Sequence, residues 1–156
     1  MNIKIKRYQE ISEPEQLSSF KILNQKWIIE YYNTIPAMDL KILDNPKKEI
    51  IDKGGQILFA NSGSTSIGTV ALVPHKDGLE IAKLAVDPNY RNMGVGGQLV
   101  ARAIREAKIL GHHSVYLYTN AKKLPAAFSL YQKLGFIVEE TLVENPRCET
   151  KMTREL

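Results

Sequence analysis

One stretch of the chain carries most of the information about its fold: Leu84-Ala85-Val86-Asp87-Pro88-Asn89-Tyr90-Arg91-Asn92-Met93-Gly94-Val95-Gly96-Gly97-Gln98-Leu99. The pattern indicates the end of a strand, a turn at Asp87-Pro88-Asn89, a glycine-rich loop and the start of a helix. Glycines at the mouth of a helix let backbone N–H groups approach a ligand, and the helix N-terminus adds partial positive charge. The loop from Arg91 to Gly97 therefore predicts a binding site for phosphate groups.

Three phosphate-binding patterns can be compared with this loop. A Walker loop ends in Gly-Lys-Ser/Thr, whereas this chain has Gly96-Gly97-Gln98. A Rossmann dinucleotide fingerprint needs a third glycine where this chain has Leu99. The third pattern, Q/R-x-x-G-x-G/A, is filled at every fixed position by the residues from Arg91 to Gly96. A glycine-rich turn without a ligand is the structural alternative for so short a motif.

The segments before the loop predict helices first and then strands. Ser12 and Glu15 suggest a capping box, with Pro14 in the first turn of a long amphipathic helix. Apolar residues at three- and four-residue steps continue that helix to Tyr31, and Pro36 interrupts it. The other elements expected here are a strand at Asn2–Tyr8, a helical stretch at about 38–51 broken at Asn45-Pro46, and strands at 56–60, 66–73 and 79–86.

The segments after the loop complete a single α/β (α+β) domain. An amphipathic helix follows the loop as far as Leu110, and Gly111 is suited to end it. The later elements are a strand at 115–119, a helix at 125–134 and strands at 136–142 and 148–154. With no internal repeat or linker, residues 1–156 are expected to form one domain around a mixed sheet.

Composition and charge exclude few classes of function. The chain has 156 residues and a net charge of +4, with no Lys/Arg run dense enough to suggest a nucleic-acid partner. The charge suits a small polyanionic ligand and equally an ordinary surface. Cys148 is the single cysteine, so no internal disulfide can form and a cytoplasmic location is expected. No apolar run is long enough to span a membrane, and the adjacent His112-His113 suggests no metal site.

The loop and its flanks resemble the GNAT acetyltransferase superfamily along essentially the full chain. Arg91 to Gly96 fills the family's pyrophosphate pattern, Glu80–Val86 is similar to its fourth strand, and Leu130-Tyr131-Gln132-Lys133-Leu134-Gly135-Phe136 resembles its late motif L-Y-x-K-x-G-F. The resemblance implies a single GNAT-type domain whose twisted mixed sheet is splayed in the middle, with helices on both faces. It also implies an enzyme that transfers the acetyl group of acetyl-CoA, without a metal, to a primary amine of a small molecule or peptide by direct attack in a ternary complex.

The resemblance also implies which residues contact the cofactor. The pantetheine arm would pair with the strand that ends at Val86, whose backbone N–H resembles the family's oxyanion donor. Asn120 resembles a side chain that contacts the cofactor, although many members have an Asn where this chain has Leu124. The implied contacts are Leu84, Ala85, Val86, Arg91, Asn92, Met93, Gly94, Val95, Gly96, Gly97, Asn120 and Tyr131.

Two side chains are candidates for proton transfer. Tyr131 matches the family position that protonates the CoA sulfur; the alternative is a tyrosine packed in the core. Glu80 is the candidate base, because strand alternation would place it on one face with the apolar residues Ala82, Leu84 and Val86. Its alternative is an exposed position at the start of the strand, and a base acting through water, or none, is also open.

The acceptor side of the protein is less well specified by the sequence. Trp27 and Tyr31 lie one helical turn apart and could line an acceptor pocket, but a core stripe is the interpretation favoured by their spacing. An exposed late strand could pair two copies into a homodimer. The functional alternative to an enzyme is a non-catalytic sensor or scaffold that has a GNAT fold and binds acyl-CoA.

Overall fold

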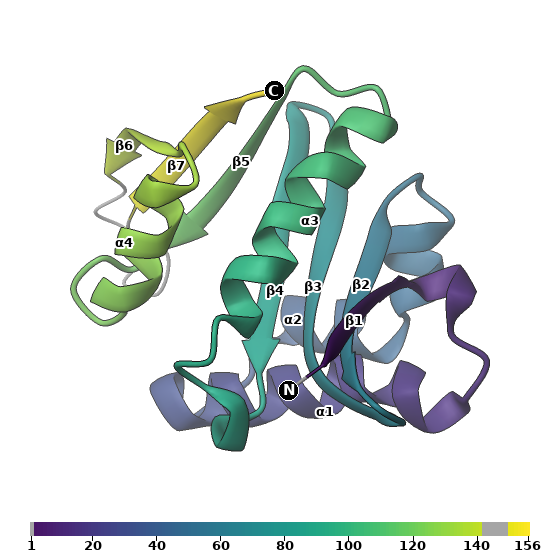
Figure 1. The fold of residues 1–156 in the computed structure, drawn as a ribbon. Helices are drawn as coiled ribbons and strands as arrows, with labels where there is room; N and C mark the ends of the chain where they lie inside the picture. Colours follow the sequence, from purple (N-terminus) through teal and green to yellow (C-terminus); the bar gives the residue numbers. More distant parts are fainter. Residues whose placement is uncertain (1, 142–149) are drawn as a thin grey trace.

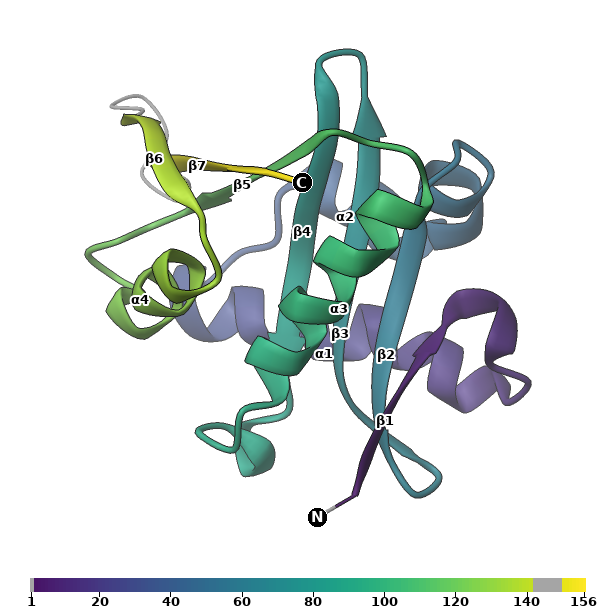
Figure 2. The same ribbon diagram turned by 45° about the horizontal axis from the view of Figure 1, so that its top comes forward.

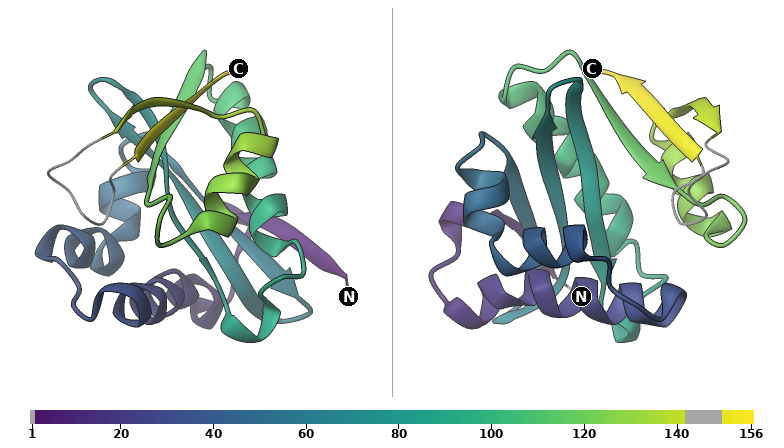
Figure 3. Two further views of the ribbon diagram at one scale, coloured as in Figure 1. Left: turned by 90° about the vertical axis from the view of Figure 1, so that its left-hand side faces the viewer. Right: turned by 180° about the vertical axis from the view of Figure 1, so that it is seen from behind.

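The computed structural model describes residues 2–141 and 150–156. Its elements are β1 (Ile3–Arg7), η1 (Tyr8–Glu10), α1 (Pro14–Tyr32), α2 (Ala37–Asp44), η2 (Lys47–Ile51), β2 (Gln56–Ser62), β3 (Thr65–His75), β4 (Gly78–Val86), η3 (Pro88–Tyr90), α3 (Val95–Ile109), β5 (Ser114–Thr119), α4 (Pro125–Lys133), β6 (Ile137–Thr141) and β7 (Thr150–Glu155). The strands form one mixed sheet in the order β1-β2-β3-β4-β5-β7-β6. Helix α3 crosses one face, and α1 and α2 cover the other (Figures 1 and 3).

Each face of the central strands has its own hydrophobic core. Strand β3 is buried from Ile67 to Val73, so alternate residues must face opposite sides of the sheet. Val70 and Leu72 pack toward α3 with Leu99 and Val100. The opposite core contains Ala71 and Val73 of β3, together with Phe20 and Ile28 of α1, Leu43 of α2 and Phe59 of β2. The sheet is thus the middle layer of three (Figure 2).

Strands β4 and β5 are the place where the sheet opens. They run parallel, yet they pair only at Glu80 and Tyr116. Beyond that point they diverge toward their carboxyl ends, and β5 continues instead with β7 and β6 as a separate antiparallel wing (Figure 1). Among the described residues, the edge of β4 from Ile81 to Val86 therefore has no strand partner on the β5 side. This confirms the expected splayed mixed sheet with helices on both faces.

A β-bulge changes which way β4 presents its side chains. Thr69 of β3 pairs with Ala85 and Ala71 pairs with Ala82, so one residue of β3 faces two of β4, Lys83 and Leu84. Lys83 has a φ of 58°, in the left-handed region. After the bulge, Leu84 and Val86 pack on the α3 side, whereas Ala82 packs on the α1 side. The expectation that one face carries Glu80, Ala82, Leu84 and Val86 is wrong for the last two, because the bulge interrupts simple alternation.

Other sequence expectations hold with small shifts. Helix α1 does begin at Pro14, but its N-cap is Glu13 and no side chain bonds the cap, so the predicted capping box of Ser12 and Glu15 is wrong. The helical stretch expected at 38–51 is α2 followed by a short π-helical turn, with the break at Asn45 and Pro46 as expected. Cys148 and the predicted strand ends at 142 and 148 lie outside the described residues.

An ion cluster around the buried Glu106 joins β1 to α3. Arg7 Nε donates to both carboxylate oxygens of Glu106 at 3.0 Å, and Arg102 Nε donates to Glu106 Oε1 at 2.9 Å. Burial alone would raise the pKa of Glu106, but the hydrogen bonds and charges of the two arginines outweigh burial and lower it. These hydrogen bonds join the edge strand β1 to helix α3.

No helix in the described ranges, 2–141 and 150–156, combines the length and apolar character needed to cross a bilayer. The same residues contain no group of three or more His, Cys, Asp or Glu side chains placed to hold a metal ion.

Candidate active site

Two cavities meet where β4 and β5 separate. The larger is a cleft of about 550 Å³ between the glycine loop, the start of α3 and α4. The smaller, of about 150 Å³, lies between β4 and β5 beneath α1. Both are lined by Trp27, Leu84, Leu124 and Tyr131, so these four residues form the junction between them.

The glycine loop forms one end of the larger cleft. Gly94, with a φ of 80°, precedes the first residue of α3 and so allows the sharp entry into the helix. Gly96 and Gly97 lie in the first turn, where backbone N–H groups have no acceptor within the helix. Nine of the twelve implied cofactor contacts line this cleft: Leu84, Val86, Arg91, Asn92, Gly94, Val95, Gly96, Gly97 and Tyr131.

Three implied contacts do not line the cleft. Ala85 is buried at 1% exposure, and the side chain of Met93 is on the surface at 54%. Asn120 is buried, and its Oδ1 accepts the backbone N–H groups of Lys122 and Lys123 at 3.2 and 3.0 Å. The Asn120 side chain therefore shapes the loop between β5 and α4, while its predicted contact with a cofactor stays a prediction.

The size of Gly96 leaves the floor of the cleft open. A Cβ placed there would be 3.9 Å from Val86 Cγ2 and 4.0 Å from Leu84 Cδ2, which is ordinary van der Waals contact. The protein fold itself therefore does not require glycine at this position. A glycine that lines a cleft at a helix N-terminus, without a packing reason to be there, fits the close approach of an anionic ligand.

Two cations at the mouth of the cleft are tied to the end of α1. Arg91 Nη1 lies 2.9 Å from Glu30 Oε2, and the hydrogen bond from Arg91 lowers the pKa of Glu30. Lys123 Nζ donates to the Tyr31 carbonyl at 3.1 Å and sits 4.6 Å from the centre of the Tyr32 ring. These partners are partly exposed, so an incoming phosphate could compete for both cations at small cost.

Tyr131 stands at the junction of the two cavities. Its ring packs edge-on against Phe136, with centroids 6.1 Å apart. Burial raises the pKa of Tyr131 to about 12. The phenol therefore keeps its proton throughout the neutral range, as a proton donor must.

Glu80 lies where β4 and β5 begin to separate, and it lines the smaller cavity. Its Oε1 is 2.8 Å from His75 Nε2, and its side chain is 20% exposed. Next to it, the Tyr116 hydroxyl donates to Asp77 Oδ1 at 3.0 Å, and burial raises the pKa of Tyr116. Glu80 is thus neither a fully solvated residue nor a core residue, and its carboxylate is held at the cavity wall.

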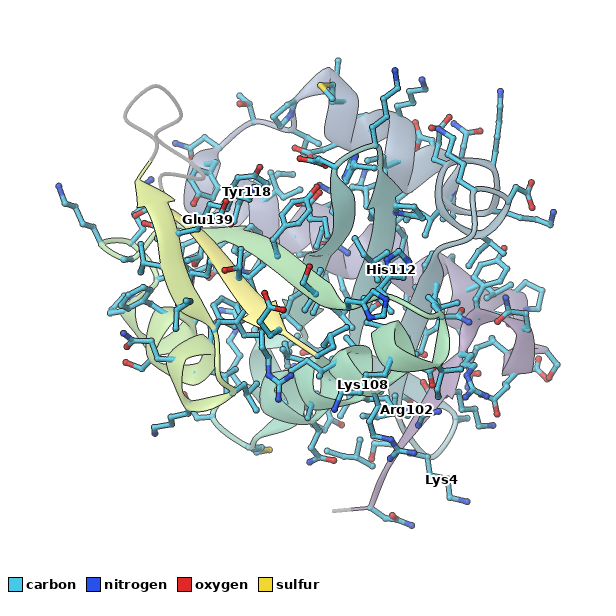
Figure 4. All side chains as sticks on the ribbon, turned by 90° about the horizontal axis from the view of Figure 1, so that it is seen from above. Lys4, Arg102, Lys108, His112, Tyr118 and Glu139 are labelled. Atoms are coloured by element: carbon cyan, nitrogen blue, oxygen red, sulfur yellow. The ribbon has the colours of Figure 1, made fainter. Side chains whose placement is uncertain are left out.

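The structure gives Trp27 and Tyr31 more than a packing role. Trp27 packs against the core beneath α1 and also lines both cavities, and Tyr31 lines the larger one. The favoured core-stripe interpretation therefore describes only part of their environment. Tyr118 also lines the smaller cavity. Figure 4 shows that it lies on the same side of the molecule as Glu139 of β6, away from the basic residues Lys4, Arg102 and Lys108 of β1 and α3.

Sequence reasoning missed four polar residues of the smaller cavity, namely Asn24, Lys83, Tyr118 and Thr119. Asn24 is 1% exposed, and its Nδ2 donates to the Phe20 carbonyl at 2.8 Å. Lys83 reaches the cavity only because of the bulge. A polar residue among the apolar positions of the α1 helix was the available signal for Asn24, whereas no local pattern marks Lys83.

Sequence comparison agrees with this geometry. The profile of the acetyltransferase (GNAT) family matches residues 20–136, which include the glycine loop, the splayed strands and Tyr131. The chain belongs to the GNAT family. An uncharacterized N-acetyltransferase of Schizosaccharomyces pombe is 32% identical to this GNAT protein over 142 residues, covering 85% of this chain and 83% of the relative.

Solved structures show the same GNAT fold. A GNAT acetyltransferase of Staphylococcus aureus superposes with a TM-score of 0.81 at 22% identity, over 99% of each chain. The PaiA N-acetyltransferase of Thermoplasma acidophilum, solved in complex with coenzyme A, superposes with a TM-score of 0.73 at 22% identity over 100% of each chain. These similarities establish the architecture around the two cavities.

Proposed function

We propose that this GNAT protein transfers the acetyl group of acetyl-CoA to a primary amine of a small molecule or peptide by direct attack, with both substrates bound together. The observation that carries the proposal is the edge of β4 from Ile81 in the smaller cavity to Val86 beside the glycine loop, which has no strand partner on the β5 side among the described residues. A free strand edge offers backbone donors and acceptors to an extended ligand.

The larger cleft suits the parts of acetyl-CoA. The pyrophosphate would lie on the N–H groups of the loop from Arg91 to Gly97, with Arg91 and Lys123 compensating its charge. The pantetheine arm has amide groups that would pair with β4 near Leu84 and Val86. This arrangement brings the thioester to Tyr131, at the junction with the smaller cavity. That the related PaiA protein was solved with coenzyme A supports this assignment.

The reaction forms one bond, breaks another and needs two proton transfers. The neutral amine nitrogen bonds to the acetyl carbon, and the bond from that carbon to sulfur breaks. The amine proton would pass to Glu80, directly or through water, and the Tyr131 phenol would give its proton to the departing sulfur. The backbone N–H of Val86 would stabilise charge on the acetyl oxygen. The bound-together geometry requires no acetyl-enzyme.

The test is a thiol-release assay with acetyl-CoA and a panel of primary amines. We expect amine-dependent release of free CoA, an acetylated amine by mass spectrometry, and initial-rate patterns in which both substrates are bound before product leaves. Ping-pong kinetics with an isolable acetyl-enzyme would contradict direct attack. Tight CoA binding without thiol release for any amine would instead support a non-catalytic acyl-CoA sensor or scaffold.

A further inference from the structure

A charged pair connects the β4 bulge to α2 at the wall of the smaller cavity. Lys83 projects from the bulge with a side chain that is 15% exposed, and its Nζ contacts Asp39 Oδ1. The side chain of Asp39 is 6% exposed. Because both partners are largely removed from water, the contact compensates charge that would be costly to bury alone.

The charges around the smaller cavity are few. Among its described wall residues, Lys83 is the single Lys or Arg and Glu80 the single Asp or Glu. Since Asp39 compensates Lys83, the charge that these wall residues leave to act on a ligand is the carboxylate of Glu80, whose Oε1 lies 2.8 Å from His75 Nε2. Asn24 already donates its amide to the Phe20 carbonyl, and the remaining wall consists of apolar and neutral side chains, including Trp27.

Such a wall distinguishes between amines by what lies next to the nitrogen. An ammonium or amine group finds a carboxylate and aromatic faces, both of which attract a cation. A carboxylate attached to the same carbon would be desolvated close to Glu80, and the described wall residues offer it no cation besides the masked Lys83, which is unfavourable. We propose that Asp39 is a specificity-determining residue: by masking Lys83, it restricts acceptors to amines that lack a carboxylate beside the reacting nitrogen.

This inference rests on the proposed acetyltransferase activity and narrows its acceptor. Amines such as alkyl amines, diamines, aryl-ethylamines and peptide amines meet the condition, because none carries a carboxylate on the carbon that bears the nitrogen. The α-amine of a free amino acid does not meet it. Removing the Asp39 charge would leave the Lys83 ammonium available in the cavity, in the place where an α-carboxylate needs a partner.

The test uses acceptors that differ only in that carboxylate. Acetylation of 2-phenylethylamine is compared with that of free L-phenylalanine, and acetylation of tryptamine with that of free L-tryptophan, by mass spectrometry and thiol release. For the wild-type protein we expect kcat/KM to favour the decarboxylated amine at least about tenfold. This arm needs no variant, so it does not depend on any substitution being tolerated.

The second arm changes the pair itself. Asp39→Asn should raise kcat/KM for the amino acid, so that the ratio of kcat/KM between the decarboxylated amine and the amino acid falls at least about fivefold. In the double variant that also carries Lys83→Met, kcat/KM for the amino acid should return to the wild-type value. Asp44→Asn is the matched control, because Asp44 lies on the same helix and forms an exposed ion pair with Lys21; its preference should equal that of the wild type. CoA affinity and melting temperature are measured for each protein.

The outcomes separate the two proposals. Equal use of both members of each pair by the wild type, or an unchanged preference in a folded Asp39→Asn protein, overturns the role of Asp39 while leaving the acetyltransferase activity in place. If acetyl-CoA binds but no amine on a broad panel is acetylated, the proposed function fails, and the inference falls with it.

Discussion

Glu106 and Asp39 are both buried carboxylates paired with cations, yet they lie in different surroundings. Glu106 is 2% exposed, bonds two arginines between β1 and α3, and lines neither of the two cavities. Asp39 is 4% exposed and holds one lysine, which itself lines a cavity. The comparison teaches that a buried ion pair is not in itself a sign of function; the space beside it decides whether the charge can act on a ligand.

The two sides of β4 differ in the same way. On the β3 side the strand is paired along its length apart from the bulge, and the cores above and below are closed. On the β5 side one residue pair holds the strands together before they separate. We therefore expect changes on the closed side to alter stability and changes on the open side to alter binding and rate.

The largest effect should come from the closed side. Glu106→Ala leaves two arginines without their buried partner, which costs about 3 kcal/mol of unfolding free energy, at the low end of the usual range because both arginines can turn toward water. We expect the melting temperature to fall by roughly 6–12 °C. Thermal unfolding measures this, and the CoA affinity of the folded protein should stay unchanged.

The exposed Glu155→Ala is the control for charge removal and should change stability by less than about 0.5 kcal/mol. Because the pKa of Glu106 is lowered on folding, its contribution is present above the pKa of the unfolded carboxyl group and is lost as pH falls through the folded value. The difference between wild type and Glu106→Gln should therefore shrink in acid. A Glu106→Ala protein as stable as wild type would remove the ion cluster as a source of stability.

An intermediate effect is expected at the glycine loop. Gly96→Val keeps the helix but fills the floor of the larger cleft, so the dissociation constant for CoA should rise at least about 30-fold, which corresponds to about 2 kcal/mol. The dissociation constant of Gly96→Ala should lie between those of the wild type and Gly96→Val. Calorimetric titration with CoA makes the measurement.

Gln98→Val is the matched control for Gly96→Val, since it places the same β-branched side chain in the same helical turn at an exposed position that does not line the cleft. Its CoA affinity should be that of the wild type. Equal affinity in Gly96→Val would show that the pyrophosphate does not lie where the loop predicts.

The smallest of the three effects is expected at Tyr131. Tyr131→Phe keeps the ring contact with Phe136 and removes the hydroxyl, so kcat should fall at least about tenfold while CoA affinity and melting temperature change little. Because burial raises the pKa of Tyr131 to about 12, the phenol stays protonated as the amine loses its proton, and the wild-type rate should climb with pH up to about pH 10 without loss of the acid.

Tyr8→Phe is the control for the loss of a tyrosine hydroxyl, because Tyr8 packs against the core beneath α1 and lines neither cavity. Full kcat in a folded Tyr131→Phe protein would exclude the phenol from the mechanism. It would also give weight to a binding function without catalysis.

Local patterns in the sequence were sufficient to predict much of the molecule. The glycines from Gly94 to Gly97, with the strand before them and the helix after them, specify backbone geometry through neighbouring residues, and the structure forms that loop as expected. Hydrophobic periodicity likewise located most of the helices and strands. The roles of Tyr131 and Glu80 in catalysis are still predictions, although both side chains line the cavities.

The features that the sequence could not predict depend on contacts between distant segments. The bulge arises from how β3 pairs with β4, and nothing in the residues around Lys83 marks a left-handed conformation. The Lys83 pair with Asp39 joins positions 44 residues apart. Exposed aspartates and lysines are common in any chain, so burial alone distinguishes this pair, and burial is a property of the assembled fold.

The extra residue in β4 also has a genetic consequence. Because the bulge absorbs one residue, deletion of the Lys83 codon would let Ala82 and Leu84 alternate regularly, so Ala82 would still face α1 and Leu84 and Val86 would still face α3. The deletion would instead remove the side chain that pairs with Asp39, while the two faces of the strand kept their residues. The length of β4 at the bulge is therefore constrained by the role of Lys83 and not by the alternation of its neighbours.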